Sequence, residues 1–333
     1  MENPVLAEVT RGNTVESRHR GSAIVVDADG GVVFSAGDVE RPVFPRSAVK
    51  AIQALPLLES GAADRYGLTE AEIALAVSSH SGEPLHAQTS LSMLRKAGRD
   101  AGCLECGAHW PMNEAAARAL AIAGGEPSAL NNNCSGKHAG FVCLSCGLDA
   151  DPAGYVKPDH AVQQAVRGAL EEVTGAAHTG ERMGIDGCSI PSYAVPLKAL
   201  ALGFARLGSG RGLGPARARA AARIRAAAAA HPFMVAGTDR FDTRLMGLLG
   251  ARAFTKTGAE GVYCAALPEL GLGLALKCDD GAGRAAEVAL AALLGRFLPM
   301  DEPTQAAFAP LREAVLKNWN GIEVGRVRAP AAN

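Results

Sequence analysis

Ser47 and Lys50 lie three residues apart in a stretch whose apolar residues recur with helical spacing. Residues i and i+3 of a helix share one face, so the lysine amine can approach the serine hydroxyl. Burial disfavours the charged ammonium, and a neutral amine can take the hydroxyl proton and so activate a weak nucleophile. The chain contains no other Ser-x-x-Lys, although so short a match arises by chance at roughly even odds.

A second lysine belongs to the rarer tripeptide Lys256-Thr257-Gly258, on an expected strand late in the chain. A Ser-x-x-Lys helix followed much later by a Lys-Thr-Gly strand resembles the serine β-lactamases and penicillin-binding proteins, in which this lysine lines the cleft. The alternative is an ordinary lysine at a strand edge. Ser79 stands in a third polar segment, 78–83, which follows a buried apolar run and is either a site loop or a helix cap.

The segment 131–138 is dense in reactive side chains and places Cys134 three residues before Lys137. Its Gly-Lys dipeptide lacks the earlier glycine that a phosphate-binding loop requires. A thiolate at Cys134 could bind zinc, or have its pKa lowered at a helix N-terminus. Cys188, two residues after Asp186, offers a second soft ligand, but two cysteines do not define a zinc site by spacing. The Cys-x-x-Cys pairs at 103/106 and 143/146 are too far apart for a zinc ribbon and are expected in the core.

The surrounding elements must bring these distant residues together. Residues 4–37 predict a β meander, and a helical pattern begins at 46. Residues 68–230 are mostly helical in pattern, strands return between about 251 and 277, and 285–298 predict an amphipathic helix. We therefore expect an α/β fold with an antiparallel sheet from 1–45 and 232–333. A mostly helical region, 46–231, then carries the Ser-x-x-Lys and Cys-Ser-Gly-Lys-His segments.

The composition excludes several classes of protein. The chain has 333 residues, 48 % of them hydrophobic, with 33 basic and 34 acidic side chains and a net charge of −1. This excludes a disordered chain and argues against nucleic acid as a partner. No apolar run approaches the ~20 residues that span a membrane, and the N-terminal residues show no secretory signal. We therefore expect a cytoplasmic protein with reduced thiols, in which the Ala- and Arg-rich stretch 216–230 is a solvated surface helix.

Together these segments resemble the asparaginase II family, the Rhizobium-type or class 3 L-asparaginases, over nearly the whole chain. The segments that carry the resemblance are Pro45-Arg46-Ser47-Ala48-Val49-Lys50, Ser79-His80-Ser81-Gly82-Glu83, Asn133-Cys134-Ser135-Gly136-Lys137-His138-Ala139-Gly140, Asp186-Gly187-Cys188 and Lys256-Thr257-Gly258-Ala259-Glu260-Gly261. The Cys-Ser-Gly-Lys-His segment is the most specific of them.

This resemblance implies a serine β-lactamase-like fold, a homodimer, and hydrolysis of L-asparagine to L-aspartate and ammonia. It implies that Ser47 is the nucleophile in tandem with Lys50, and that Ser79 forms a second tandem with Lys256. It further implies a zinc ion, and residues that bind the substrate beside it. The zinc ligands would be Cys134, Lys137 and Cys188, and the substrate-binding residues Arg46, His138 and Asp186.

Two alternatives remain open from the sequence. One is a penicillin-recognising or other serine amidohydrolase, which shares the Ser-x-x-Lys and Lys-Thr-Gly motifs but usually works outside the cytoplasm. The other is a non-catalytic zinc-binding sensor, for which the cysteines would be the main support. Turnover of the β-lactam nitrocefin distinguishes the first alternative, and zinc-dependent partner binding without amidase activity distinguishes the second.

Overall fold

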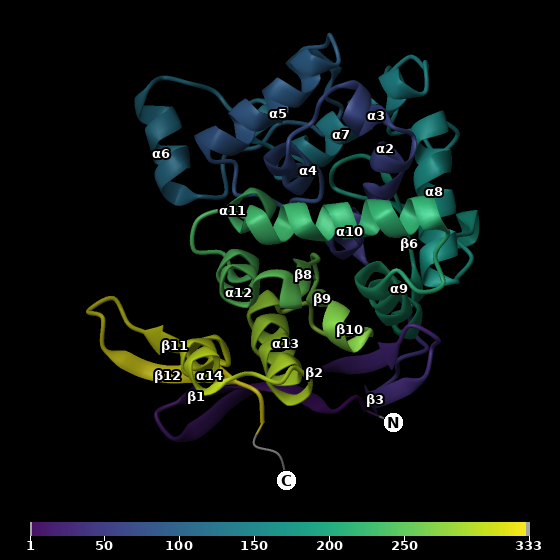
Figure 1. The fold of residues 1–333 in the computed structure, drawn as a ribbon. Coiled ribbons are helices and arrows are strands. Elements are labelled where there is room, and N and C mark those ends of the chain that lie inside the picture. The colour runs from purple at the N-terminus through teal and green to yellow at the C-terminus, as the bar shows by residue number, and fades with distance from the viewer. Residues whose placement is uncertain (1, 331–333) are drawn as a thin grey trace.

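Within residues 2–330, the part of the chain that this computed structural model describes, one antiparallel sheet joins the two ends of the sequence (Figure 1). Strand β2 (Thr14–Asp27) unites it, because it pairs with β1 up to Arg20 and with β10 from Gly21 onward. A Cβ atom on Gly21 would lie 2.1 Å from the Lys277 carbonyl oxygen, so the crossing requires glycine. The strand order is β11 (Glu313–Lys317), β12 (Glu323–Arg328), β1 (Val5–Arg11), β2, β10 (Leu272–Cys278), β9 (Val262–Leu267) and β8 (Phe254–Thr257), with β3 (Val32–Ala36) also paired to β2.

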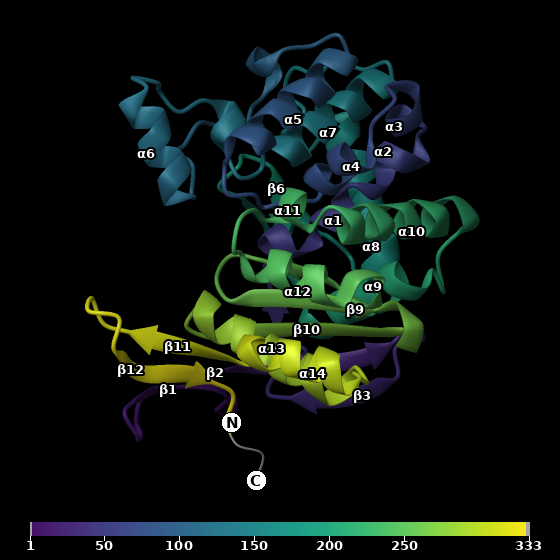
Figure 2. The ribbon, with the colours of Figure 1, turned by 60° about the vertical axis from the view of Figure 1, so that its left-hand side comes forward.

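Both faces of this sheet are covered by helices, because side chains alternate along each strand. In β9, Val262, Cys264 and Ala266 belong to one hydrophobic cluster, and the residues between them belong to the other. Helix α9 (Leu197–Ser209) lies so close to the first face that a Cβ atom on Gly273 would be 2.0 Å from the Ala201 carbonyl oxygen. Helix α13 (Gly283–Phe297) covers the second face (Figure 2).

Between the strands of this sheet the described chain is mostly helical (Figure 1). The expected helix after residue 46 is broken into η1 (Arg46–Val49), α1 (Lys50–Gln53) and α2 (Leu55–Glu59). Two short strand pairs, β4 (Pro42–Val43) with β7 (Val195–Pro196) and β5 (Met183–Ile185) with β6 (Pro191–Tyr193), connect the helical region to the sheet region. The other helices are α3 (Ala62–Arg65), α4 (Glu70–Ala76), α5 (Pro84–Lys96), α6 (Glu114–Ile122), α7 (Ser135–Gly147), α8 (Ala161–Thr174), α10 (Pro215–Ala230), α11 (Pro232–Val235), α12 (Phe241–Leu249) and α14 (Glu302–Phe308).

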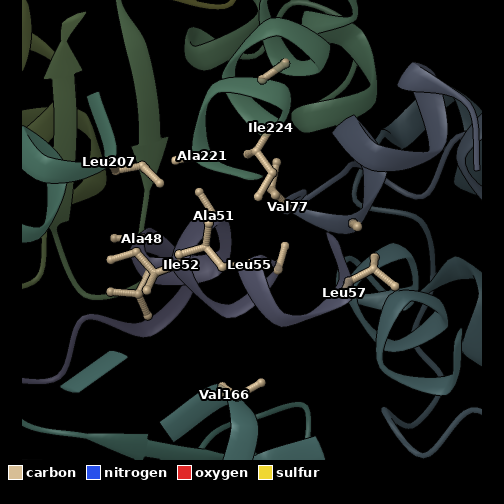
Figure 3. Packing of buried hydrophobic residues seen from close by; sticks show 14 of the residues in the cluster. Ala48, Ala51, Ile52, Leu55, Leu57, Val77, Val166, Leu207, Ala221 and Ile224 are labelled. Carbon is tan, nitrogen blue, oxygen red and sulfur yellow. The ribbon is translucent and has the colours of Figure 1, made fainter. Parts of the chain in front are cut away.

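Helix α10 corrects one expectation, because it is not a solvated surface helix. One of its faces is fully buried among α1, α2, α4 and α9, as Figure 3 shows for Ala221 and Ile224 beside Ala51 and Leu55. Alanine allows such close packing because its side chain stops at Cβ. The arginines that suggested a solvated helix occupy the other face, where Arg217 forms a two-pronged ion pair with Glu59.

The expected arrangement of strands at both ends and helices between them is confirmed. The structure is a mixed α/β fold with a curled antiparallel sheet covered by helices. Because α9 comes from the helical region and packs on the sheet, the two regions share one hydrophobic cluster. Within residues 2–330, every helix is too short or too polar to cross a membrane.

Candidate active site

Two buried lysines meet at one serine hydroxyl. The Nζ atom of Lys50, at the start of α1, lies 2.9 Å from the Oγ atom of Ser79, and the Nζ atom of Lys256, on β8, lies 3.1 Å from the same oxygen. Ser79 is held in place by its backbone N–H, which donates to the Val235 carbonyl oxygen at 3.0 Å. All three side chains are almost fully buried. The sheet region and the helical region thus each supply one amine to this hydroxyl.

Ser47 lies at the edge of this group and is half-buried on η1. Its hydroxyl makes no hydrogen bond to Lys50 or to any other described residue, whereas Lys50 donates to the Ser78 carbonyl oxygen at 2.5 Å and contacts Cys134 Sγ at 3.1 Å. The direct Ser47–Lys50 contact that helical spacing suggested is therefore not formed in this structure. A Cβ atom on Gly258 would lie 2.6 Å from the Pro45 carbonyl oxygen, so the end of the Lys-Thr-Gly strand lies against η1 beside Ser47.

Lys256 has the electrostatics of a base. Complete burial lowers the pKa of its amine to about 7, and the nearby charges of Lys50 and Arg240 act in the same direction. The carboxylate of Asp242 and, more weakly, the thiol of Cys134 act in the opposite direction. Near neutral pH much of this amine is therefore uncharged and can accept a proton from a hydroxyl.

Asp242 is a functional candidate that sequence reasoning missed. It lies on α12 and is 2 % exposed. Its Oδ1 atom accepts hydrogen bonds from Thr255 Oγ1 and Tyr263 Oη, both at 2.7 Å, and its Oδ2 atom accepts one from the Thr257 backbone N–H at 3.1 Å. These contacts hold β8 in position around Lys256. An aspartate in an apolar stretch was the available signal, but its partners are identified only by the fold.

The two predicted thiols also meet. Lys137 Nζ lies 3.0 Å from Cys188 Sγ, and a hydrogen bond between the two thiols lowers the pKa of Cys134 and raises that of Cys188. Two sulfurs and one amine therefore converge, which is a donor set that suits zinc. Residues 2–330 contain no group of three or more His, Cys, Asp and Glu side chains placed to hold a metal, so any such site requires the lysine.

Arg46 and Asp186 form an ion pair beside Ser47. Nε and Nη2 of Arg46 lie 2.9 and 2.8 Å from Asp186 Oδ1. Burial raises the pKa of the Asp186 carboxyl, but the hydrogen bond from Arg46 and the charge of Lys137 leave it lower than usual. Arg46 has a φ of 50°, a conformation that costs a non-glycine residue energy. Both side chains line a hollow of about 430 Å³ together with Phe44, Lys277 and others.

His138 stands apart from the group around Ser79. Its Nδ1 atom lies 2.6 Å from Tyr155 Oη, its Nε2 atom has no partner within the described residues, and burial lowers its pKa well below the usual value. It is therefore neutral. Another buried histidine, His80, was not predicted as a site residue, yet it links the Ser79 loop to α7 through a 2.9 Å contact with Ser135 Oγ.

The fold and this arrangement define a hydrolase-type site with paired serine and lysine side chains on a mixed α/β scaffold. The family model of L-asparaginase II matches residues 7–329, nearly the whole chain. The chain therefore belongs to the L-asparaginase II family, and it is an amidohydrolase of that class.

Other comparisons are more distant. Three similar solved structures are crystal structures of a protein called Mglu, one of them in its native form and another in its tris and glutamate form. Each is 16 % identical, with TM-scores of 0.38, 0.38 and 0.37. The aligned parts cover 85 %, 86 % and 85 % of this chain and 69 %, 66 % and 61 % of those chains. No curated protein sequence matches this chain.

Proposed function

We propose that this protein hydrolyses L-asparagine to L-aspartate and ammonia through a serine nucleophile activated by lysine. The observation that carries the proposal is the Ser79 hydroxyl bound by both Lys50 and Lys256, with Ser47 at its edge. Family membership gives the amide-hydrolysing class. The Lys-Thr-Gly strand lying against η1 supports our inference that the scaffold is of the serine β-lactamase type.

In this mechanism Ser47 attacks the side-chain amide carbon of asparagine. It is more accessible than Ser79, and its N–H occupies the first turn of η1, where helix geometry leaves it without an intrahelical acceptor. That N–H can hold the developing oxyanion. The Ser47 proton passes to Lys50, and the Ser79 hydroxyl with the Lys256 amine supplies the proton to departing ammonia. Water then hydrolyses the aspartyl ester and restores Ser47.

The Arg46–Asp186 pair suits the charged end of an amino acid. A guanidinium binds a carboxylate and a carboxylate binds an ammonium, so the α-groups of the substrate can replace the contacts that these side chains make with each other. Such fixed polar groups are needed to distinguish asparagine from glutamine, because one methylene alone is worth only about 1–3 kcal/mol.

We further propose that Cys134, Lys137 and Cys188 hold a zinc ion, supported by their convergence on one point. The metal would supply a fixed positive charge beside the amino-acid end of the pocket. Lys137 must lose its proton to act as a ligand, so we expect zinc binding to be pH-dependent. We also infer a homodimer, as in the family that the chain resembles.

Ammonia release from L-asparagine tests the activity. We expect release by the wild-type protein and a loss of at least about a thousandfold in kcat for Ser47→Ala, with folding unchanged. Ser209→Ala is a matched control, because this serine lies on α9, away from the site, and donates only to the Ala205 carbonyl oxygen. Retained activity in Ser47→Ala together with loss in Ser79→Ala would reassign the nucleophile. Turnover of nitrocefin without ammonia release would overturn the asparaginase proposal.

A further inference from the structure

One edge of the sheet is left open on a projecting hairpin. β11 pairs only with β12, and within residues 2–330 no strand pairs with its outer edge. The β11–β12 hairpin extends away from the body of the molecule in both views (Figures 1 and 2). Val315 at the centre of β11 is 44 % exposed, and Trp319 at the hairpin tip is fully exposed. An open strand edge with exposed apolar residues is a template for pairing with another chain.

The sequence of this edge is complementary to itself. β11 runs Glu313-Ala314-Val315-Leu316-Lys317, with an acid at one end, a base at the other and Val315 midway. If two copies pair antiparallel about a two-fold axis at Val315, Glu313 of each copy lies opposite Lys317 of the other. Opposite charges directly across a strand pair stabilise it. Lys317 forms no ion pair with any residue of 2–330, so its charge is free for such a contact.

The same register brings the hairpin tip to a hollow. Continued beyond the strands, it places Trp319 opposite Leu311 of the second copy. Leu311 lines a hollow of about 570 Å³ at the base of the hairpin, between α12, α13 and the segment that enters β11. Phe241 and Val288 supply apolar walls there, and Arg244 supplies a guanidinium, which favours the face of an indole ring.

We propose that the protein forms a two-fold symmetric dimer by pairing of its β11 strands, with Trp319 of each copy seated in the hollow beside Leu311 of the other. A stable dimer buries about 800 Å² on each partner, which a five-residue strand pair alone does not provide. The tryptophan supplies a buried anchor of the kind that dominates binding energy at interfaces. Helix α6 projects on the same side in both views and ends in Ile122, which is 88 % exposed, so this side offers further apolar contact.

The charge pattern allows a rescue experiment on the full-length protein. Sedimentation and light scattering should show a dimer for the wild type. Lys317→Glu should raise the dimer dissociation constant at least about tenfold, because it faces Glu313 of the second copy. The double variant Glu313→Lys with Lys317→Glu should restore the dimer. Glu313 also pairs with Arg326 within its own chain, and the double variant does not recover that contact. Rescue therefore reports the contact between copies.

Trp319→Ala should weaken the dimer by a similar or larger factor, with thermal unfolding of the subunit unchanged. Lys157→Glu and Val33→Ala are the matched controls, since both residues are exposed and lie on other elements. A wild-type monomer at tens of micromolar would overturn the proposal. So would a dimer whose dissociation constant is unchanged by Lys317→Glu and by Trp319→Ala. The proposal does not rest on the amidase activity, and ammonia release measured in parallel separates failure of one from failure of the other.

Discussion

Lys50 and Lys256 share the hydroxyl oxygen of Ser79 as a hydrogen-bond partner, at 2.9 and 3.1 Å. Two ammonium groups on one buried oxygen would repel each other strongly, because the surroundings screen charge poorly. The lower pKa of Lys256, about 7, relieves this repulsion by leaving that amine uncharged. The Ser79 hydroxyl can then donate to Lys256 while it accepts from Lys50, which gives a defined direction for proton transfer.

The pKa of Lys256 predicts the pH dependence of the reaction. The neutral amine is the active form, and its fraction rises as the pH increases through about 7. We therefore expect kcat/KM to rise across this interval and to level off above it. Lys256→Gln keeps a polar side chain but removes the base, and should lower kcat by about 10²–10⁴-fold and abolish the rise. A profile that is flat from mildly acidic to mildly alkaline pH in the wild type would contradict this role.

Asp242 provides an independent test of the same electrostatics. Its negative charge raises the pKa of Lys256, so Asp242→Asn should lower that pKa further and move the rise in kcat/KM to lower pH. The amide also matches the three donors around it less well, which should lower the free energy of unfolding by about 1–3 kcal/mol. Thr255→Val is the control, because it removes one hydrogen bond and keeps the charge. Equal shifts of the pH profile in both variants would argue against the charge effect.

The thiol pair predicts where zinc binds. Cys188→Ser should weaken zinc affinity by at least about a hundredfold in equilibrium dialysis, because a neutral hydroxyl replaces a soft thiolate donor. Cys143→Ser serves as the comparison, since Cys143 is also buried but contacts the Met93 carbonyl oxygen on another part of α7. Zinc affinity that falls equally in the two variants would place the metal elsewhere. Ammonia release with and without a chelator then measures whether the metal affects turnover.

The contact between α9 and β10 predicts a large effect on stability. Gly273→Ala would place a methyl group 2.0 Å from the Ala201 carbonyl oxygen and 2.2 Å from the Ala205 backbone nitrogen. Both neighbours are backbone atoms, so helix and sheet must separate, and we expect a loss of about 1–3 kcal/mol or more. Gly283→Ala meets no atom within 4 Å at the start of α13 and is the matched control. Chemical denaturation of both variants measures the difference, and equal midpoints would contradict the close packing.

The sequence by itself determined the elements and the residue types of the site. Alternating apolar residues predicted the strands at both ends, because a side-chain period of two is a local property of extended backbone. The Ser-x-x-Lys, Lys-Thr-Gly and Cys-Ser-Gly-Lys-His segments marked Ser47, Lys256 and Cys134 for the same reason: each motif is short and can be recognised without knowing its neighbours. These segments also carried the resemblance to the family that the whole-chain match supports.

Only the tertiary structure decided which of these residues touch. Spacing along a helix suggested that Lys50 contacts Ser47, but the chain breaks into short turns there and the amine contacts Ser79 instead. The positions of Asp242 behind β8 and of the buried face of α10 follow from packing between distant segments. Such contacts depend on how whole elements pack against one another, and no local pattern specifies the distance between side chains that lie far apart in the chain.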